Sequence, residues 1–323
     1  MLRWTNMLLP VLWIIGAAAG YVYALQQNIP LGTALRVLPA FLLEVSFFYV
    51  LGSERLRARI EKWPPVAIAI VLTLAALAPY TIAATALGSF GRTAFLAIAG
   101  LAAVVSFWYV LLPHKPAADV LFLVLMGTMM LARVFPHLYV SPIPKLQLPV
   151  LGQAMWIRTG AFAMLSIRRV GGVGFGFWPN KREWKIGALF YLGFLAVAIW
   201  IAWWIGFGKP RLPVGWEKTT LYAIATFFGI LWVVAMGEEF FFRGLLQQWM
   251  TRWMKSDTAG LIFTSLLFGA VHLWFRTFPN WRFAVLAAIA GIFYGLAFQR
   301  ARSIRASMVA HALVVTTWRI FFP

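Results

Sequence analysis

The amino-acid sequence predicts an all-α, polytopic membrane protein with about 10 to 11 transmembrane helices. Of its 323 residues, 62% are hydrophobic, which at about 20 residues per span is enough for about ten spans. Only 11% of the residues are charged, whereas a soluble domain carries about 25%. With so few charged residues, a soluble enzyme is excluded. There are also no cysteines, which excludes disulfides, thiolate nucleophiles and cysteine-ligated zinc.

Ten apolar stretches, separated by short basic or Pro/Gly-rich breaks, are each long enough to cross a bilayer. They cover residues 7–25, 35–52, 66–87, 93–112, 119–135, 186–206, 219–241, 259–278, 283–299 and 304–322. An eleventh stretch, 150–167, is interrupted by Gln153, Arg158 and Thr159. It could span, re-enter or lie flat, and we favour a span because the distribution of basic residues then fits one orientation.

The basic residues predict that orientation. Four of them follow the second span, namely Arg55, Arg57, Arg59 and Lys62, while the loop 26–30 after the first span has no charge. Because Lys and Arg collect in short cytoplasmic loops, the amino terminus is expected in the cytoplasm. Lys209, Arg211 and Lys218 disagree, since they would lie outside. The first 25 residues could also be a cleaved signal peptide, but the many later spans favour an uncleaved anchor.

We therefore expect a multi-pass protein of the cell (inner) membrane whose surroundings are the lipid bilayer. The net charge of +19 would suggest nucleic acid in a soluble chain, but here it reflects orientation, and no nucleic-acid partner is expected. A basic, glycine-rich segment, 168–185, predicts a linker between two membrane regions. The expected domains are residues 1–167, of unknown role, and a helical core over residues 186–323.

The chain has nine acidic residues, and six of them fall in loops or at span ends, where water solvates them. Glu44 lies inside the second predicted span and is a lone intramembrane acid. Such a residue is a functional candidate by default, although we favour a structural polar contact. Arg36 is too far along the same helix to be its direct partner, because eight residues span about 12 Å.

Glu238 and Glu239 are adjacent inside the span 219–241 and are followed by three phenylalanines. Placing one carboxylate in a span costs roughly 2.5 to 3.5 kcal/mol on insertion scales. Arg243 lies four residues after Glu239 on the same helical face, which predicts a buried ion pair. Glu238 points about 100° away and has no local partner. It is suited to taking a proton from water.

Four histidines complete the census of candidate groups. We expect His114 and His137 in interfacial loops, whereas His272 and His311 lie inside predicted spans. Phe268 lies one turn before His272 on the same face. An unpaired acid and two imidazoles on three successive helices could activate a water molecule and stabilise an oxyanion.

These residues resemble the motifs of the CAAX protease and bacteriocin-processing family, also called Abi. Glu238-Glu239-Phe-Phe-Phe-Arg243 matches E-E-x-x-x-R, Phe268-Gly-Ala-Val-His272 matches F-x-x-x-H, and His311 lies where the third motif begins. The connecting stretches Gly291-Ile-Phe-Tyr-Gly295 and Ser303-Ile304 fit as well. The resemblance covers roughly the last 140 residues. Members of this family include glutamic intramembrane endopeptidases that cleave prenylated CAAX proteins.

The resemblance implies a role for each matching residue. Glu238 and His272 would activate the attacking water, Glu239 and Arg243 would support the site electrostatically, and His311 would help to bind the tetrahedral oxyanion. The family pattern places an Asn or similar polar residue four positions after this histidine, where this chain has Val315. Valine cannot donate a hydrogen bond, so catalysis is less efficient or the donor comes from elsewhere.

The leading hypothesis is a peptidase that hydrolyses a membrane-associated protein or peptide, CAAX-like, otherwise lipidated or a sorting-tail protein, without metal or cofactor. Three alternatives stay open. Two histidines and a glutamate could ligate zinc, although H-E-x-x-H is absent. The chain could be a non-catalytic immunity or scaffold protein, for which Val315 is the best support. A transporter could use buried Glu and His as a proton relay.

Overall fold

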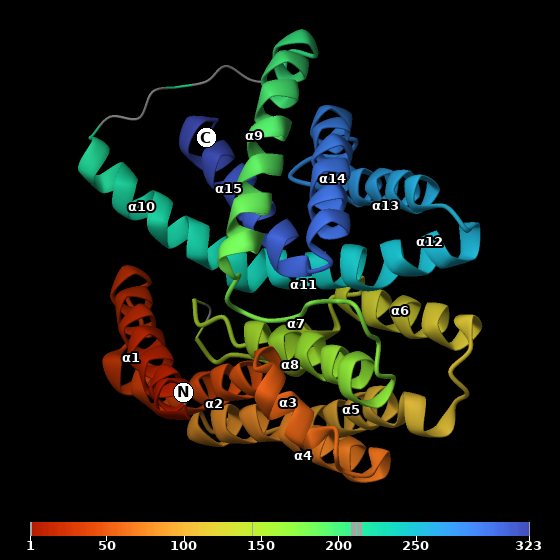
Figure 1. Ribbon diagram of the computed structural model, residues 1–323. Coiled ribbons are helices and arrows are strands. Elements are labelled where there is room, and N and C mark those ends of the chain that lie inside the picture. Colours follow the sequence, from red (N-terminus) through yellow and green to blue (C-terminus); the bar gives the residue numbers. More distant parts are fainter. Residues whose placement is uncertain (1, 144, 208–210, 212–214, 323) are drawn as a thin grey trace. The chain divides into compact units, whose positions relative to one another are not determined.

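The computed structural model describes residues 2–143, 145–207, 211 and 215–322. The chain divides into two compact units, Met1–Val170 and Gly171–Pro323, and both are drawn in Figure 1. Every regular element in the described residues is a helix. The prediction of an all-α fold is confirmed. Lys209, one basic residue of the predicted outer loop, lies outside the described residues.

Unit 1 is a bundle of helices from the amino-terminal half. Its helices are α1 (Leu2–Gln26), α2 (Leu31–Gly52), α3 (Glu54–Ile60), α4 (Pro65–Ala86), α5 (Arg92–Leu111), α6 (Pro116–Leu131), α7 (Val134–Leu138) and α8 (Pro149–Phe162), which continues as the π-helical η1 (Ala163–Ile167). Helices α2, α4 and α5 all contact α8. Helix α8 is the polar-interrupted stretch of the sequence, and most of it is buried.

Unit 2 holds the second half of the chain. Its helices are α9 (Lys181–Trp204), α10 (Trp216–Gly229), η2 (Ile230–Ala235), α11 (Met236–Glu239), η3 (Phe240–Gln247), α12 (Gln248–Met254), α13 (Asp257–Val271), η4 (His272–Trp274), α14 (Trp281–Ala301) and α15 (Ile304–Phe321). Helices α9, α14 and α15 pack pairwise against one another, and α13 packs on α14. In Figure 1 these helices lie along the long helical run from α10 through α12.

In the described residues, nine helices are long and apolar enough to cross a membrane. The predicted stretches near 119–135 and 304–322 are not among them: α6 has 16 residues, and α15 carries Arg305, His311 and Arg319. Leu131, Trp203 and Val233 are 86%, 78% and 76% exposed, as expected for side chains that lipid covers. The chain is a multi-pass integral membrane protein.

Glu44 of unit 1 forms a buried ion pair with Arg158, which joins α2 to α8. The Arg158 Nε donates to Glu44 Oε1 over 2.7 Å, and Nη2 donates to Oε2 over 3.3 Å. The same Nη2 also donates to the Ala75 carbonyl of α4. The guanidinium stands 4.6 Å from the centre of the Phe47 ring. This polar contact satisfies both carboxylate oxygens of Glu44.

The first segment of unit 2, before α9, is fixed to the start of α15 by hydrogen bonds of its backbone carbonyls. The Ile304 N–H donates to the Val173 carbonyl, and the Ser303 hydroxyl donates to the Gly174 carbonyl. Gly174 has φ +60, and a Cβ there would lie 2.5 Å from Ser303, so both the conformation and the contact require glycine. Asn180 then forms a capping box that starts α9 at Lys181.

Glycines on α14 allow close packing against the helices that carry the site. A Cβ on Gly295 would overlap a Leu261 methyl carbon and would lie 2.6 Å from the Gln247 side-chain oxygen. A Cβ on Gly291 would lie 3.1 Å from the Ser265 backbone. Both glycines of this Gly-x-x-x-Gly stretch therefore serve close helix packing.

The predicted span 259–278 is too long at its carboxyl end. Helix α13 ends at Val271, and His272 begins the short 3-10 turn η4. The Asn280 backbone N–H closes the following loop by donating to the Leu273 carbonyl. Trp274, Phe275 and Phe278 keep the hydropathy of this loop high, so apolarity alone did not reveal the helix end. His272 lies at a helix end, not well inside a span.

Candidate active site

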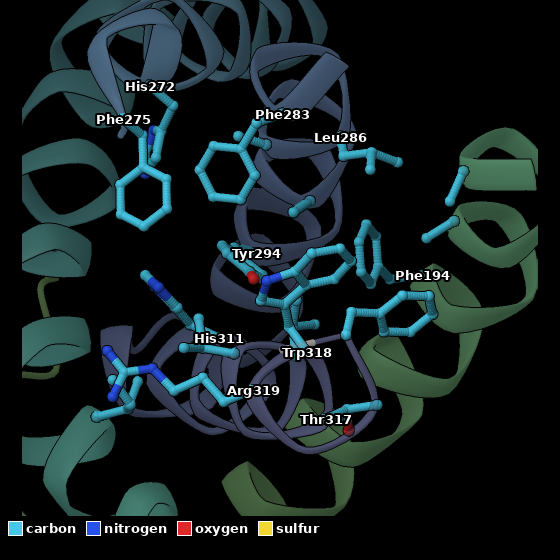
Figure 2. Close-up of a pocket in the computed structure, with 18 of the residues that line it drawn as sticks. Phe194, His272, Phe275, Phe283, Leu286, Tyr294, His311, Thr317, Trp318 and Arg319 are labelled. Atoms are coloured by element: carbon cyan, nitrogen blue, oxygen red, sulfur yellow. The ribbon is translucent and has the colours of Figure 1, made fainter. Parts of the chain in front are cut away.

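One cavity in unit 2 collects the predicted reactive side chains. It has a volume of about 530 Å³, and its lining includes Glu238, His272, His311, Tyr294 and Val315. Figure 2 shows His272, His311 and Tyr294 directed into this space from η4, α15 and α14. The structure therefore brings the acid and both imidazoles together. Helices α9, α14 and α15 contribute many of the remaining wall residues, and most of these are aromatic or aliphatic.

Glu239 is the centre of a buried charged network behind the cavity. The Arg243 Nη1 lies 3.0 Å from Glu239 Oε1, and both side chains are 0% exposed. The His311 Nδ1 lies 2.8 Å from the same oxygen. The Arg243 Nη2 also donates to the Gly291 carbonyl over 3.2 Å. The ion pair expected from the spacing of Glu239 and Arg243 is confirmed.

Glu238 differs from its neighbour because it faces the cavity. Its Oε2 is buried and has no hydrogen-bond partner among the described residues, although the side chain as a whole is 35% exposed. The His311 Nε2 lies 4.0 Å from Glu238 Oε2. Two π-helical segments, η2 and η3, flank the turn that carries the two glutamates. Such segments occur frequently at functional sites.

Hydrogen bonds orient both imidazole rings. The His272 Nδ1 lies 2.6 Å from the Phe268 carbonyl, and a carbonyl can only accept, so Nδ1 carries the proton. The His311 Nδ1 lies 2.8 Å from Glu239 Oε1, the same carboxylate oxygen that accepts from Arg243, so Nδ1 is the donor in this contact. In the neutral form of each ring, Nε2 is therefore the unprotonated nitrogen. Each histidine can accept a proton at Nε2.

Phe268 holds the charged network and the imidazoles in place. Its side chain is 2% exposed, and its ring centre lies 4.5 Å from the Arg243 guanidinium carbon. The ring centre is 4.6 Å from that of His272 and 6.0 Å from that of His311. Phe268 therefore packs near the site's cation and both imidazoles.

Val315 lines the cavity four residues after His311. Its isopropyl group offers no hydrogen-bond donor where the related pattern has a polar residue. Thr316 beside it is not among the lining residues, and its buried hydroxyl has no partner. The departure seen in the sequence therefore persists in the structure.

Sequence reasoning missed six polar side chains of the cavity wall. These are Tyr222, Arg276, Tyr294, Thr317, Trp318 and Arg319. Tyr294 lies inside the Gly-x-x-x-Gly stretch, where the glycines drew attention to packing. Trp318 lies seven residues after His311 and so shares its helical face, which is the one signal that could have found it. The two arginines are exposed.

The described His, Asp and Glu side chains form no group of three or more that could hold a metal ion. His272 and His311 each use Nδ1 for a protein acceptor. Because metal-ligating histidines commonly donate Nδ1–H to such acceptors and bind the metal through Nε2, these hydrogen bonds leave the zinc alternative open. Catalysis is derived below from the acid and the imidazoles.

Comparison with known proteins gives one match. Residues 219–317 match the family model of "Rce1-like: Type II CAAX prenyl endopeptidase Rce1-like". No curated protein and no solved structure matches the chain significantly. The matched region contains all three sequence motifs and none of unit 1. Residues 219–317 are therefore an Rce1-like region, which confirms the family resemblance that the ordered motifs indicated.

Proposed function

We propose that the protein is a glutamic intramembrane endopeptidase, which hydrolyses a peptide bond with a water molecule activated by Glu238 and His272. The observation that carries the proposal is the buried, unbonded Oε2 of Glu238, in a cavity that also contains both imidazoles. Keeping a polar atom unpaired in such a place costs about 1–3 kcal/mol. This cost is understandable if a water molecule or a substrate group binds there.

In the proposed reaction, the water oxygen attacks the carbonyl carbon of the scissile bond while Glu238 accepts one water proton. The carbonyl electron pair moves to its oxygen and forms a tetrahedral oxyanion. When the C–N bond breaks, Glu238 returns the proton to the leaving amine. His272 orients the water through its free Nε2 and shares the proton transfer. The products are a new carboxyl group and a new amino group, with no covalent intermediate.

The charged and ionisable residues beside Glu238 have separate roles in this mechanism. Glu239, neutralised by Arg243, holds the Nδ1–H of His311 and so fixes this ring. His311 helps to bind the oxyanion when both of its nitrogens carry protons. Because Arg243 is fully buried and bonded to Gly291, the network is anchored to α14 and does not reorganise during the reaction.

The cavity wall supports a membrane-associated substrate. Most of the lining is apolar, including Phe194, Ile199 and Leu286. Apolar pockets of several hundred Å³ bind apolar ligands of matching size. The description of the matching family model names a CAAX prenyl endopeptidase. We infer a CAAX-like, otherwise lipidated or sorting-tail protein as the substrate, presented from the bilayer. The proposed location is the cell (inner) membrane with a cytoplasmic amino terminus.

A cleavage assay tests this function. The full chain in liposomes is incubated with a farnesylated peptide that ends in a CAAX sequence, and the products are identified by mass spectrometry. We expect Glu238-dependent cleavage, with near-complete loss in Glu238→Gln, a variant of equal size. Comparing membrane proteomes of cells that express either form would then reveal the natural substrate as a polypeptide that stays uncleaved.

Two alternatives make different predictions. A scaffold protein of the same fold, which Val315 favours, would keep its biological effect in Glu238→Gln. A zinc enzyme would lose activity on stringent chelation, whereas the proposed mechanism predicts a rate within about twofold of the untreated protein. Metal analysis of the purified protein accompanies the chelation experiment.

A further inference from the structure

The site contains a gap where the oxyanion forms. A tetrahedral intermediate needs hydrogen-bond donors directed at its oxygen, and Val315 supplies none. Both histidines, in their neutral forms, present an unprotonated Nε2 to the cavity, because each Nδ1–H is used elsewhere. A neutral donor must then come from another part of the wall.

Tyr294 on α14 has the required position. Its ring is stacked on His311, with a centroid distance of 4.8 Å and an angle of 12° between the planes. The side chain is 2% exposed, yet it lines the cavity that contains Glu238 and His272. Figure 2 shows its oxygen facing the cavity interior.

The backbone of Tyr294 is fixed as firmly as its ring. The Ser307 hydroxyl of α15 donates to the Tyr294 carbonyl over 2.8 Å. The ring also lies 5.2 Å from the Arg243 guanidinium carbon. Packing between the cation and His311 leaves the phenol little freedom to rotate. A buried and oriented O–H group of this kind is suited to electrostatic stabilisation.

We propose that Tyr294 is a catalytic residue whose hydroxyl donates a hydrogen bond to the oxyanion and replaces the amide donor absent at Val315. This inference rests on the proposed peptidase function. As the carbonyl electron pair moves to oxygen, the phenol shortens its hydrogen bond to the growing charge and keeps its proton. The bond returns to ordinary strength when the C–N bond breaks. No other reactant is needed.

Other hydroxyls near this end of the site are less suitable. The Thr317 hydroxyl lines the cavity but is already paired with the Tyr191 hydroxyl over 2.7 Å. The Thr316 hydroxyl is buried away from the lining. Tyr294 is the donor that directly contacts the His311 ring.

The test is a comparison of Tyr294→Phe with Tyr191→Phe in the liposome cleavage assay. Phenylalanine keeps the stacked ring and removes only the donor, so we expect kcat to fall about 10²- to 10³-fold with little change in KM. Tyr191→Phe removes a hydroxyl that is already bonded to Thr317, and its kcat should stay within about twofold. Thermal unfolding verifies that both variants are folded.

A second arm transplants the missing donor. Adding Val315→Asn to Tyr294→Phe places an amide at the position where the related pattern has one, and we expect at least tenfold recovery of kcat, because a donor is restored. If the wild type shows Glu238-dependent cleavage and Tyr294→Phe retains its kcat within about threefold, the role of Tyr294 is wrong while the peptidase function stands. If the wild type shows no Glu238-dependent cleavage, the proposed function itself fails.

Discussion

Each of the two units buries an arginine–glutamate pair between helices, but only one pair adjoins a reactive group. In unit 1, Arg158 satisfies both carboxylate oxygens of Glu44. In the described part of unit 2, Glu239 Oε2 and Arg243 Nε have no hydrogen-bond partners. Beside them, Glu238 also has an unbonded oxygen, and it lines a cavity. The same residue types therefore form a complete contact in one unit and an incomplete one in the other.

The difference indicates how to distinguish structural from catalytic polar groups in a membrane protein. Buried polar atoms are normally hydrogen-bonded, and each exception needs an explanation. In unit 1, both carboxylate oxygens of the pair are bonded, and the pair has a structural role because it joins α2 to α8. The incomplete network of unit 2 leaves bonding capacity for a water molecule and a substrate. Predictions that substitute matched residues in the two units test this distinction.

The largest expected effect comes from the histidines. His272→Ala should lower kcat about 10²- to 10⁴-fold, because a general base or water-orienting group is lost. His114 of unit 1 also has one ring nitrogen near a carbonyl, with Nε2 3.2 Å from the Tyr109 oxygen. His114→Ala should leave kcat unchanged. A steady-state cleavage assay on both variants is sufficient, and an equal loss in both would remove the distinction between the units.

The arginines should affect stability in both units and activity in one. Removing one partner of a buried pair costs about 3–5 kcal/mol, so Arg243→Ala and Arg158→Ala should both lower the free energy of unfolding in detergent. Only Arg243→Ala should also abolish cleavage by the folded protein. Arg36, which bonds only to a backbone carbonyl at an exposed position, is the control, and Arg36→Ala should be nearly neutral. Full activity in folded Arg243→Ala would contradict the account.

A smaller effect is expected from glycines. Gly295→Ala forces a methyl group into overlap with the Leu261 side chain, and overpacking of this kind costs about 1–3 kcal/mol. At Gly100 of α5, an added methyl group would meet nothing within 4 Å, so Gly100→Ala should change stability by less than about 0.5 kcal/mol. Unfolding in mixed micelles measures both, and a stable Gly295→Ala would show that α14 can move away from its neighbours.

Much of the fold could be predicted because apolar length identifies spans independently of tertiary structure. The stretch 150–167 was ambiguous in sequence because Arg158 interrupts it, and the structure explains Arg158 by Glu44. These residues are 114 positions apart, so no local pattern could pair them. The end of α13 at Val271 was also missed, since the aromatic residues that follow it are as apolar as a helix.

The site was predicted as far as local spacing allowed. Glu239 and Arg243 are four residues apart and so share a helical face, and their ion pair could be predicted. The His311 contact with Glu239 spans 72 positions, and the ordered motifs indicated only that the two belong to one site. The stacking of Tyr294 on His311 depends on how α14 packs against α15. Spacing in the sequence does not predict how two separate helices pack.

The most direct test compares Glu238→Gln with Glu44→Gln, the same substitution at the second intramembrane acid. The measurement is kcat per folded molecule, with the folded fraction taken from thermal unfolding of each variant. The account predicts that Glu238→Gln keeps its stability but loses activity about 10²- to 10⁴-fold, while Glu44→Gln loses stability and keeps its kcat within about twofold. Retained cleavage in Glu238→Gln, or an equal loss in folded Glu44→Gln, would contradict it.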